Sequence, residues 1–331
     1  MKITVLHGVI PPDAPPDEQD TLEQLKGVMN ALAALGHEAE PLPFSLDLEA
    51  AALELKKRNP EAVFNLVDSV NGSGRLIHLA PSLLDYLGIP YTGSKTEGIF
   101  TTSAKLTAKK IMTSAGLPTP SWVAMDNGRN GGAGRYIVKS MWEHASVGLD
   151  EDSVFFASGA AEAAGAVAEK TEKNGGEWYA EEYIDGREFN ISVIGGAGGP
   201  RTFPPAEILF DGYGEGKLKV VGYRAKWVED SFEYTHTPRS FEFAEKDRPL
   251  LERLSKLSLE CWRLFGLKGY VRVDFRVDGG GNPWILEVNA NPCITTYSGF
   301  AAAAGQGGLD YEAMTGKILE DAFVRAYEHH A

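Results

Sequence analysis

The pattern of apolar and polar positions is clearest over residues 267–292, where two runs with strand character flank a glycine-rich turn. Side chains of a strand alternate between the two faces of its sheet. On the first run the apolar face consists of Val271, Val273, Phe275 and Val277. On the second run we expect one face to hold Trp284, Leu286 and Val288, and the other to hold Ile285, Glu287 and Asn289. The pattern predicts a hairpin with its loop at residues 279–282.

The expected hairpin sets two carboxylates side by side. Its register places Asp274 directly across from Glu287, and Arg272 across from Asn289. Because like charges destabilise a strand ladder, this pair indicates a bound cation. A small number of oxygen ligands is typical of Mg²⁺ that is held mainly by substrate phosphates. Since most acidic side chains are solvent-exposed, an ordinary outer face remains the alternative on this pattern alone.

Residues 1–93 alternate strand and helix patterns, which predicts a parallel sheet with helices on both faces. Strands are expected at 2–6, 38–44, 62–67 and 89–92, and helices from Asp20 to Gly36, at 48–58 and at 76–87. The expected apolar stripe of the first helix is Leu22, Leu25, Met29 and Leu32. Ligands of such sheets bind beyond the carboxyl ends of the strands. His7-Gly8 and Asp68-Ser69, which follow two strands, are therefore either a substrate wall or ordinary loop residues.

The pattern changes over residues 94–185. Helices are expected from Ser103 to Ala115 and at 158–172, and strands at 121–125, 135–139 and 177–184. Lys105 and Lys109 lie one turn apart, where a solvated face is a commoner explanation than a binding role. Lys139 ends an apolar strand, which favours a functional role for it. The loop at 141–149 could present backbone N–H groups to phosphate, although the chain has neither a P-loop nor a Rossmann glycine motif.

The last part of the chain contains a further candidate lysine and an irregular segment. A strand is expected at 188–194, a long helix at 245–265 and a C-terminal helix at 311–327. Lys226 falls in the run 220–227. The polar segment 229–240 is either a mobile cover over a site or an ordinary surface loop.

Composition limits the class of protein. The chain has 331 residues, of which 43% are hydrophobic and 24% charged, and this allows two or three globular domains. The formal net charge of −14 argues against a nucleic-acid partner. No apolar run of about 18 residues and no signal-peptide pattern occur, so we expect no membrane partner and a cytoplasmic location. Cys261 and Cys293 are too few for a disulfide framework.

Several short motifs follow one another in a specific order. They are Lys139, Ser146-Val-Gly148, Glu181-Glu182-Tyr-Ile184, Gly186-Arg-Glu188-Phe, Pro205-Ala-Glu-Ile, Lys226, Arg272-Val-Asp274-Phe and Leu286-Glu-Val-Asn289. Over nearly the whole chain this series resembles the ATP-grasp superfamily, specifically the D-alanine-D-alanine ligase family. The resemblance implies an α/β fold, α+β in part, in which two antiparallel sheets clasp ATP. It implies an N-terminal parallel α/β domain at 1–93, a central ATP-grasp subdomain at 94–185 and a C-terminal subdomain with the metal site at 186–331.

The resemblance also implies roles for individual residues. Those expected to bind ATP are Lys105, Lys139, Val147, Gly148, Glu181, Glu182, Ile184, Glu188 and Lys226. Within this set Glu181 and Ile184 would recognise the adenine base, and Glu188 would bind the ribose. Two Mg²⁺ ions, with Mn²⁺ as a substitute, would be held by Asp274, Glu287 and Asn289. The catalytic residues would be Arg272, Lys226 and Ser146, and the substrate contacts Glu18, Asp68, Asn291 and Cys293.

The implied reaction is the ATP-dependent joining of a small-molecule carboxylate to an amine through an acyl phosphate, by a homodimeric enzyme. Arg272 and a backbone N–H near Cys293 would stabilise the tetrahedral oxyanion. Either Glu18 or Asp17 would anchor the first substrate's ammonium group.

The chain departs from the family where the amino acids would bind. The differences lie at 9–18, Asp68-Ser69, Ala145-Ser146, Trp227 and Pro292-Cys-Ile-Thr295. We therefore expect substrates other than two D-alanines. The alternatives are a genuine D-alanine-D-alanine ligase of cell-wall synthesis with a divergent pocket, and an ATP-binding regulatory protein without turnover.

Overall fold

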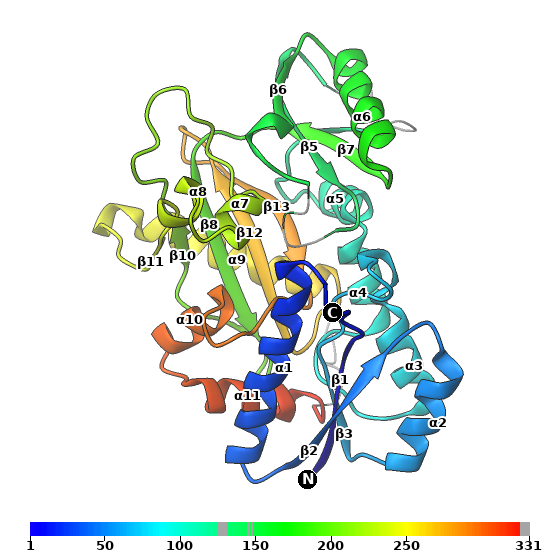
Figure 1. Ribbon diagram of the computed structural model, residues 1–331. Coiled ribbons are helices and arrows are strands. Elements are labelled where there is room, and N and C mark those ends of the chain that lie inside the picture. Colours follow the sequence, from blue (N-terminus) through cyan, green and yellow to red (C-terminus); the bar gives the residue numbers. More distant parts are fainter. Residues whose placement is uncertain (125–130, 144–145, 147, 325–331) are drawn as a thin grey trace.

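The computed structural model describes residues 1–124, 131–143, 146 and 148–324, and these residues form three β-sheets (Figure 1). The N-terminal sheet is parallel, as predicted, with the order β2-β1-β3. Its strands are β1 (Lys2–Gly8), β2 (Glu38–Phe44) and β3 (Ala62–Asn65). The helical elements beside it are α1 (Pro16–Ala34), α2 (Leu48–Arg58), the 3-10 turn η1 (Gly74–Leu76) and α3 (Leu79–Leu87). The fourth predicted strand is reduced to one bridge, between Val63 and Tyr91.

Helix α1 begins at Pro16, four residues before the predicted start at Asp20. Proline suits the first turn of a helix because its φ is already helical and its missing N–H has no partner there. The buried side chains are Thr21, Gln24, Val28, Ala31 and Leu32, whereas Leu22 of the predicted stripe is exposed. The early start carries Asp17 and Asp20 into the helix, and both contact the C-terminal part of the chain.

The central sheet is antiparallel with the order β4-β7-β5-β6. Its strands are β4 (Trp122–Val123), β5 (Gly134–Ser140), β6 (Val154–Ala157) and β7 (Trp178–Glu182). The helical elements are α4 (Thr96–Ser103), α5 (Lys105–Ser114), η2 (Glu151–Ser153) and α6 (Ala160–Asn174). Helix α6 covers one face of this sheet through Ala163 and Val167 (Figure 1). The opposite face remains available for a ligand.

Two predictions for the start of the central segment are wrong. Ser103 ends α4 and does not cap the next helix, which begins after Ala104. Lys105 and Lys109 are buried and do not form a solvated face. The cause is tertiary packing, because Met112 of the same helix lies in the core of the C-terminal sheet. This shared core crosses the predicted boundary between the two subdomains, so the domain limits stay a prediction.

The C-terminal sheet has the order β11-β10-β8-β12-β13, with β9 paired to β8. Its strands are β8 (Arg187–Ile194), β9 (Arg201–Thr202), β10 (Ala206–Ile208), β11 (Arg239–Ser240), β12 (Tyr270–Val277) and β13 (Pro283–Asn289). The helical elements are α7 (Tyr223–Trp227), α8 (Phe232–Thr235), η3 (Glu245–Asp247), α9 (Arg248–Leu264), α10 (Gly299–Gln306) and α11 (Tyr311–Asp321). Short elements α8 and β11 thus occupy the segment 229–240.

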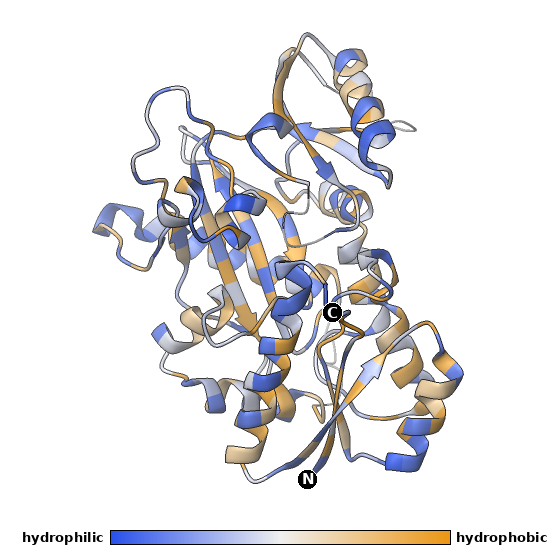
Figure 2. Ribbon diagram, viewed as in Figure 1, coloured by the Kyte–Doolittle hydropathy of each residue, from blue (hydrophilic) through white to orange (hydrophobic). Residues whose placement is uncertain are grey.

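The apolar residues of these elements form continuous cores, and Figure 2 shows the apolar colour running along β1. Helix α9 packs Leu254 and Cys261 against Val271 and Phe275 on one face of the C-terminal sheet. Helices α10 and α11 share a core with the N-terminal sheet. The C-terminal sheet is therefore covered on its apolar face, and its polar face points toward the central sheet. No helix of the described residues is long and apolar enough to cross a bilayer.

The hairpin that is clearest in the sequence is formed by β12 and β13, and its predicted register is confirmed. Asp274 pairs with Glu287, and Arg272 pairs with Asn289. The two carboxylates therefore belong to directly paired residues of neighbouring strands. All four residues line one pocket, which favours a functional origin of the pair over an ordinary solvent-exposed face.

The predicted faces of β13 are wrong at Ile285 and Leu286. A bulge leaves Leu286 without a partner on β12. Because a bulge inserts one extra residue and shifts the alternation, Ile285 joins Val288 in the core while Leu286 lines the pocket.

Candidate active site between the antiparallel sheets

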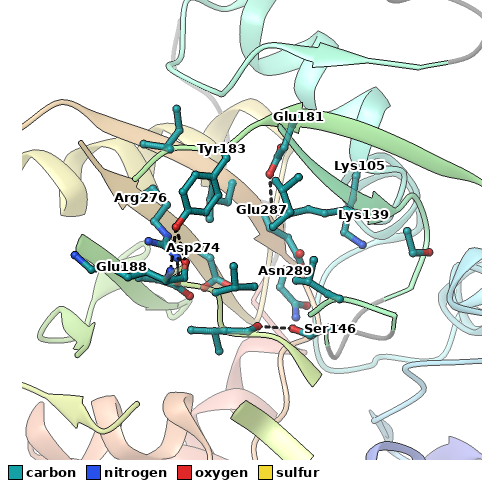
Figure 3. A pocket seen from close by; sticks show the side chains of 18 of the residues that line it. Lys105, Lys139, Ser146, Glu181, Tyr183, Glu188, Asp274, Arg276, Glu287 and Asn289 are labelled. Atoms are coloured by element: carbon teal, nitrogen blue, oxygen red, sulfur yellow. Dashed lines mark hydrogen bonds and ion pairs between the residues drawn. The ribbon is translucent and has the colours of Figure 1, made fainter. Parts of the chain in front are cut away.

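A pocket lies between the central and the C-terminal sheet (Figure 3). Strands β5 and β7 line one side, and β8, β12 and β13 line the other. The predicted site residues that it brings together are Lys105, Lys139, Ser146, Glu181, Glu182, Ile184, Glu188, Lys226, Arg272, Asp274, Glu287 and Asn289. Residues that are far apart in the sequence thus converge on one cavity.

Glu181 is held by two lysines at the end of the pocket formed by the central sheet. Its carboxylate lies 2.7 Å from the Nζ of Lys109 and also accepts a hydrogen bond from Lys139. The side chains of Lys109 and Glu181 are each only 1% exposed. Burial works to raise the pKa of Glu181, but the charges of Lys109 and Lys139 outweigh it, so that the pKa falls below its usual range. Glu181 is therefore anionic and fixed in place.

Two other lysines keep their ammonium groups available to a ligand. Lys105 donates to the carbonyl oxygen of Glu143 over 2.5 Å, and burial lowers its pKa. Burial, followed by the charge of Arg272, lowers the pKa of Lys226. Within the described residues no carboxylate lies within ion-pair distance of Lys226. Lys105 is buried and Lys226 is half-buried, and a cation partly removed from water without a close counterion favours an anionic ligand such as a phosphate.

The paired carboxylates form the opposite side of the pocket. Arg272 holds Asp274 with two parallel hydrogen bonds of 2.7 and 2.8 Å, and Asn190 donates to the same carboxylate over 2.8 Å. Burial works to lower the pKa of Arg272, but Asp274 outweighs this effect and raises it. Arg272 is thus a fixed cation beside Asp274.

The donor set of this face fits a magnesium ion. Asp274 and Glu287 supply carboxylate oxygens, and Asn289 supplies an amide oxygen. No group of three or more His, Cys, Asp or Glu side chains among the described residues could hold a metal alone. An ion here would therefore need ligand oxygens from elsewhere, which is typical of Mg²⁺ bound through phosphates.

The predicted phosphate loop is only partly described. Ser146 adopts a positive φ of 62° and donates to the carbonyl oxygen of Val221 over 2.9 Å, which ties it to the C-terminal subdomain. Gly148 lines a wide neighbouring groove, where an added Cβ would lie 2.6 Å from the ring of Trp178. Ala145 and Val147 lie outside the described residues.

Glu188, predicted to bind a ribose, forms an ion pair with Arg276, whose Nη2 lies 2.9 Å from the carboxylate. Arg276 also donates to the carbonyl oxygens of Gly186 and Lys219. Tyr183 lies beside them, and its hydroxyl accepts a hydrogen bond from the backbone N–H of Lys219 over 3.1 Å (Figure 3). Arg276 thus fixes the carboxylate of Glu188, which lines the pocket.

A second cavity of about 410 Å³ opens from this pocket, and we call it the substrate chamber. The residues that line both cavities are Glu188, Val221, Lys226, Arg272, Asp274 and Asn289. Asp68, Asn291 and Cys293 line the chamber as well. Glu18 lines the wide groove next to it and not the chamber, whereas Asp17 lines both.

An acidic cluster from α1 closes one side of the substrate chamber. Asp20 accepts a hydrogen bond of 3.0 Å from the thiol of Cys293 and one of 2.5 Å from the hydroxyl of Tyr297. Burial, reinforced by Asp20, raises the pKa of Cys293 to about 12, so the thiol is protonated at neutral pH. Asp17 accepts a hydrogen bond of 2.9 Å from Tyr223 of α7. These contacts join the N-terminal helix to the C-terminal subdomain.

Asn291 connects two distant parts of the chain, in addition to any contact with substrate. Its side-chain amide donates to the carbonyl oxygen of Val67 over 2.9 Å and accepts from the hydroxyl of Tyr270 over 2.7 Å. Asp68, on the same N-terminal edge, accepts from Thr21 over 3.1 Å. The chamber is therefore built jointly by the N-terminal sheet and the end of β13.

A family profile described as the D-ala D-ala ligase C-terminus matches residues 111–320, which is more than half of the chain. The chain belongs to the D-alanine-D-alanine ligase family. Its fold is the ATP-grasp fold, and membership of this family makes it an ATP-dependent, ADP-forming C–N ligase. The resemblance inferred from the motifs is thereby confirmed, and the regulatory alternative without turnover is disfavoured.

Individual relatives of this ligase agree with the assignment. An uncharacterized protein, y4sG, of Sinorhizobium fredii is 30% identical over 273 residues, covering 82% of this chain and 77% of the relative. The D-alanine-D-alanine ligase of Aquifex aeolicus is 29% identical over 324 residues, covering 96% and 100%. The D-alanine-D-alanine ligase of Bacillus anthracis complexed with ATP superposes with a TM-score of 0.72 at 21% identity, with 97% of each chain covered. The corresponding enzyme of Coxiella burnetii gives 0.68 at 18% identity, covering 97% and 93%.

Several residues of this ligase's site were missed in the sequence. The sequence shows Lys109 only as a neighbour of Lys105 on a helix face, because its contact with Glu181 depends on tertiary structure. Arg276 shares the period-two polar face of β12 with Arg272, and this periodicity is a signal that could have found it. The sequence pattern indicates Asp20 only as the start of a helix, and no local pattern indicates that it meets Cys293.

Proposed function

We propose that this ligase joins the carboxylate of one small molecule to the amine of another through an acyl phosphate, and that its substrates are not two D-alanines. The observation that carries the first part is the convergence of the family's nucleotide-side residues on one pocket. The second part is supported by the chamber, where Asp20, Cys293 and Tyr297 form a hydrogen-bonded group at a place where the motif departs from the family.

In the first step, a carboxylate oxygen of the donor substrate attacks the γ-phosphorus of ATP. The bond from this phosphorus to the β–γ bridging oxygen breaks, and ADP leaves. Such transfers depend on positioning and on neutralising negative charge. Lys105, Lys139 and Lys226 would supply positive charge around the phosphates.

Magnesium would add further charge neutralisation and orient the phosphates. Asp274, Glu287 and Asn289 would hold it, as two ions or with Mn²⁺ in its place. Glu188 would face the ribose, while the backbone of Glu182 and Ile184 beside Glu181 would face the adenine. Ser146 and Gly148 would border the phosphates.

In the second step, the amine nitrogen attacks the acyl carbon. The tetrahedral centre then loses inorganic phosphate, and the nitrogen loses a proton to give the amide. Arg272 would stabilise the developing oxyanion, aided by a backbone N–H near Cys293. Because Asp274 already fixes the guanidinium of Arg272, little reorganisation would be needed during this step.

A second candidate is a genuine D-alanine-D-alanine ligase, favoured by the full-length match to the Aquifex aeolicus enzyme of that name. We place either enzyme in the cytoplasm and expect a homodimer, on the family resemblance. A screen of ADP formation with Mg-ATP over pairs of amino acids and other carboxylates decides between the two candidates. ADP release only with paired D-alanine would refute the altered substrates, and release with another pair but not with D-alanine would support them.

A further inference from the structure

Arg276 lies on the polar face of β12, directly opposite Glu188 of β8. Side chains two residues apart on a strand share a face, so Arg276 is on the same side of the sheet as Asp274, which lies opposite Asn190. Both Arg276 and Glu188 line the pocket between the sheets (Figure 3). The register of the sheet therefore places an arginine beside the carboxylate that is predicted to bind a ribose.

The guanidinium of Arg276 is buried and bound by three separate segments of the chain. Its side chain is 6% exposed, and its Nη2 lies 2.9 Å from the carboxylate of Glu188. Nη1 donates to the carbonyl oxygen of Gly186 in the turn before β8 over 3.1 Å, and Nη2 donates to the carbonyl oxygen of Lys219 in the segment before α7. The ring of Phe210 packs against the group, 5.1 Å from its Cζ. These contacts give the guanidinium a defined position.

The two carbonyl groups that hold Arg276 are themselves fixed without the help of Glu188. The hydroxyl of Tyr183 donates to the carbonyl oxygen of Lys219 and accepts from its backbone N–H, each over 3.1 Å. A Cβ added to Gly186 would overlap the carbonyl oxygen of Val277, so this turn packs directly against the end of β12. Because its acceptors cannot shift easily, Arg276 in turn fixes the carboxylate of Glu188.

The carboxylate of Glu188 keeps the capacity to bind a ligand. Its side chain is 13% exposed, and among the residues that the structure describes Arg276 is the one cation within ion-pair distance of it. Burial of an unpaired carboxylate is costly, and the neighbouring cation offsets this cost. A carboxylate can accept about four hydrogen bonds, so one close cation leaves acceptor positions free for the hydroxyl groups of a ligand in the pocket.

We infer that Arg276 is a positioning residue for the nucleotide, because it holds the carboxylate of Glu188 where this group accepts hydrogen bonds from the ribose hydroxyls of ATP. The inference rests on the proposed ribose role of Glu188 and adds the residue on which that role depends. Arg276 acts through Glu188 and needs no contact with ATP. Hydrogen bonds to an ionised acceptor are stronger than those to a neutral one, so the enzyme prefers nucleotides that carry the ribose hydroxyls.

The test compares two nucleotides that differ only in these hydroxyls. Isothermal titration calorimetry measures the binding of Mg-ADP and of Mg-2′,3′-dideoxy-ADP to the full-length enzyme, and neither measurement needs a second substrate. We expect wild-type enzyme to bind ADP about 10- to 100-fold more tightly, the contribution of one charge-assisted hydrogen bond. Arg276→Met should weaken the binding of ADP by most of this factor and affect the dideoxy nucleotide far less, so that the preference falls below about threefold.

Two further variants separate positioning from general damage, with the fold of each checked by circular dichroism. Arg276→Lys keeps a positive charge beside Glu188 but lacks the guanidinium fork, and it should retain part of the preference. Arg187→Met breaks the ion pairs of a β8 arginine with Glu207 and Asp247, outside the pocket. It should lower stability and leave the preference intact. If Arg276→Met does not fold, Arg276→Lys decides: a reduced preference supports the inference, and an unchanged one overturns it.

Glu188→Ala shows whether the ribose role itself holds. A preference that is lost in Glu188→Ala but intact in folded Arg276→Met overturns the inference and leaves the ribose role of Glu188 standing. A preference that survives in Glu188→Ala, or equal binding of the two nucleotides by wild-type enzyme, overturns both. Failure of the proposed ligase function gives a different result, namely no ADP release with any pair of substrates, and the binding comparison still decides the role of Arg276.

Discussion

Replacing Lys109 with methionine removes one of the two cations that hold Glu181. The pair is nearly inaccessible to solvent, with each side chain 1% exposed and 2.7 Å between the charged atoms. Removing one partner of a buried ion pair costs ~3–5 kcal/mol. Because Lys139 still contacts the other carboxylate oxygen, we expect a smaller loss of ~2–3 kcal/mol in the free energy of unfolding. Methionine fills a similar volume, so the loss reports the charge and not a cavity.

Guanidinium unfolding followed by tryptophan fluorescence measures this loss, and Lys110→Met is the matched control. Lys110 is the next residue of α5 and is exposed, so its replacement should change stability by less than ~0.5 kcal/mol. A cycle with Glu181→Gln tests the pairing directly. The double variant, Lys109→Met with Glu181→Gln, should lose less free energy of unfolding than the two single variants lose when their losses are added. A Lys109→Met protein as stable as the control, or strictly additive losses, would refute a structural ion pair.

The remaining predictions concern turnover and thiol chemistry. Asp274→Asn and Glu287→Gln should each lower kcat on the order of 100-fold with the fold intact by circular dichroism; unchanged kinetics at saturating Mg²⁺ would exclude these side chains as metal ligands. Arg272→Lys should reduce kcat far more than ATP affinity, because an ammonium cannot reproduce the guanidinium fork; an equal loss of both contradicts an oxyanion role. Alkylation of Cys293 should accelerate about tenfold per pH unit from pH 7 to 10, because only the thiolate reacts and burial raises its pKa to about 12; a rate that levels off near pH 9 would show an ordinary thiol.

The hairpin and its carboxylates could be predicted from the sequence because they depend on local periodicity. Alternation along two adjacent strands defines the register of Asp274 and Glu287 once the loop is located. The bulge at Leu286 could not be predicted in the same way, since the extra residue is visible only in the pairing between strands. One inserted residue therefore reversed the predicted faces of Ile285 and Leu286.

The site residues that local patterns did not assign are those whose environment comes from distant segments. Lys109 has the sequence context of a solvated helix face, yet it is buried against Glu181 from another strand. Asp20 meets Cys293 across almost the whole chain, and this contact depends on where α1 begins. Motif resemblance identified the nucleotide side of the site, and only the structure brings together the residues of the substrate chamber.

Oxygen transfer from the substrate tests the central claim most directly. The pair of substrates with the highest rate of ADP release is supplied with an ¹⁸O-labelled donor carboxylate, and the released inorganic phosphate is analysed by mass spectrometry. If the reaction passes through an acyl phosphate, the released phosphate contains one ¹⁸O atom for every amide bond formed. The account further predicts that this transfer occurs with a donor and an acceptor other than two D-alanines. Amide formation with unlabelled phosphate would contradict the acyl phosphate, and transfer only with paired D-alanine would contradict the altered substrates.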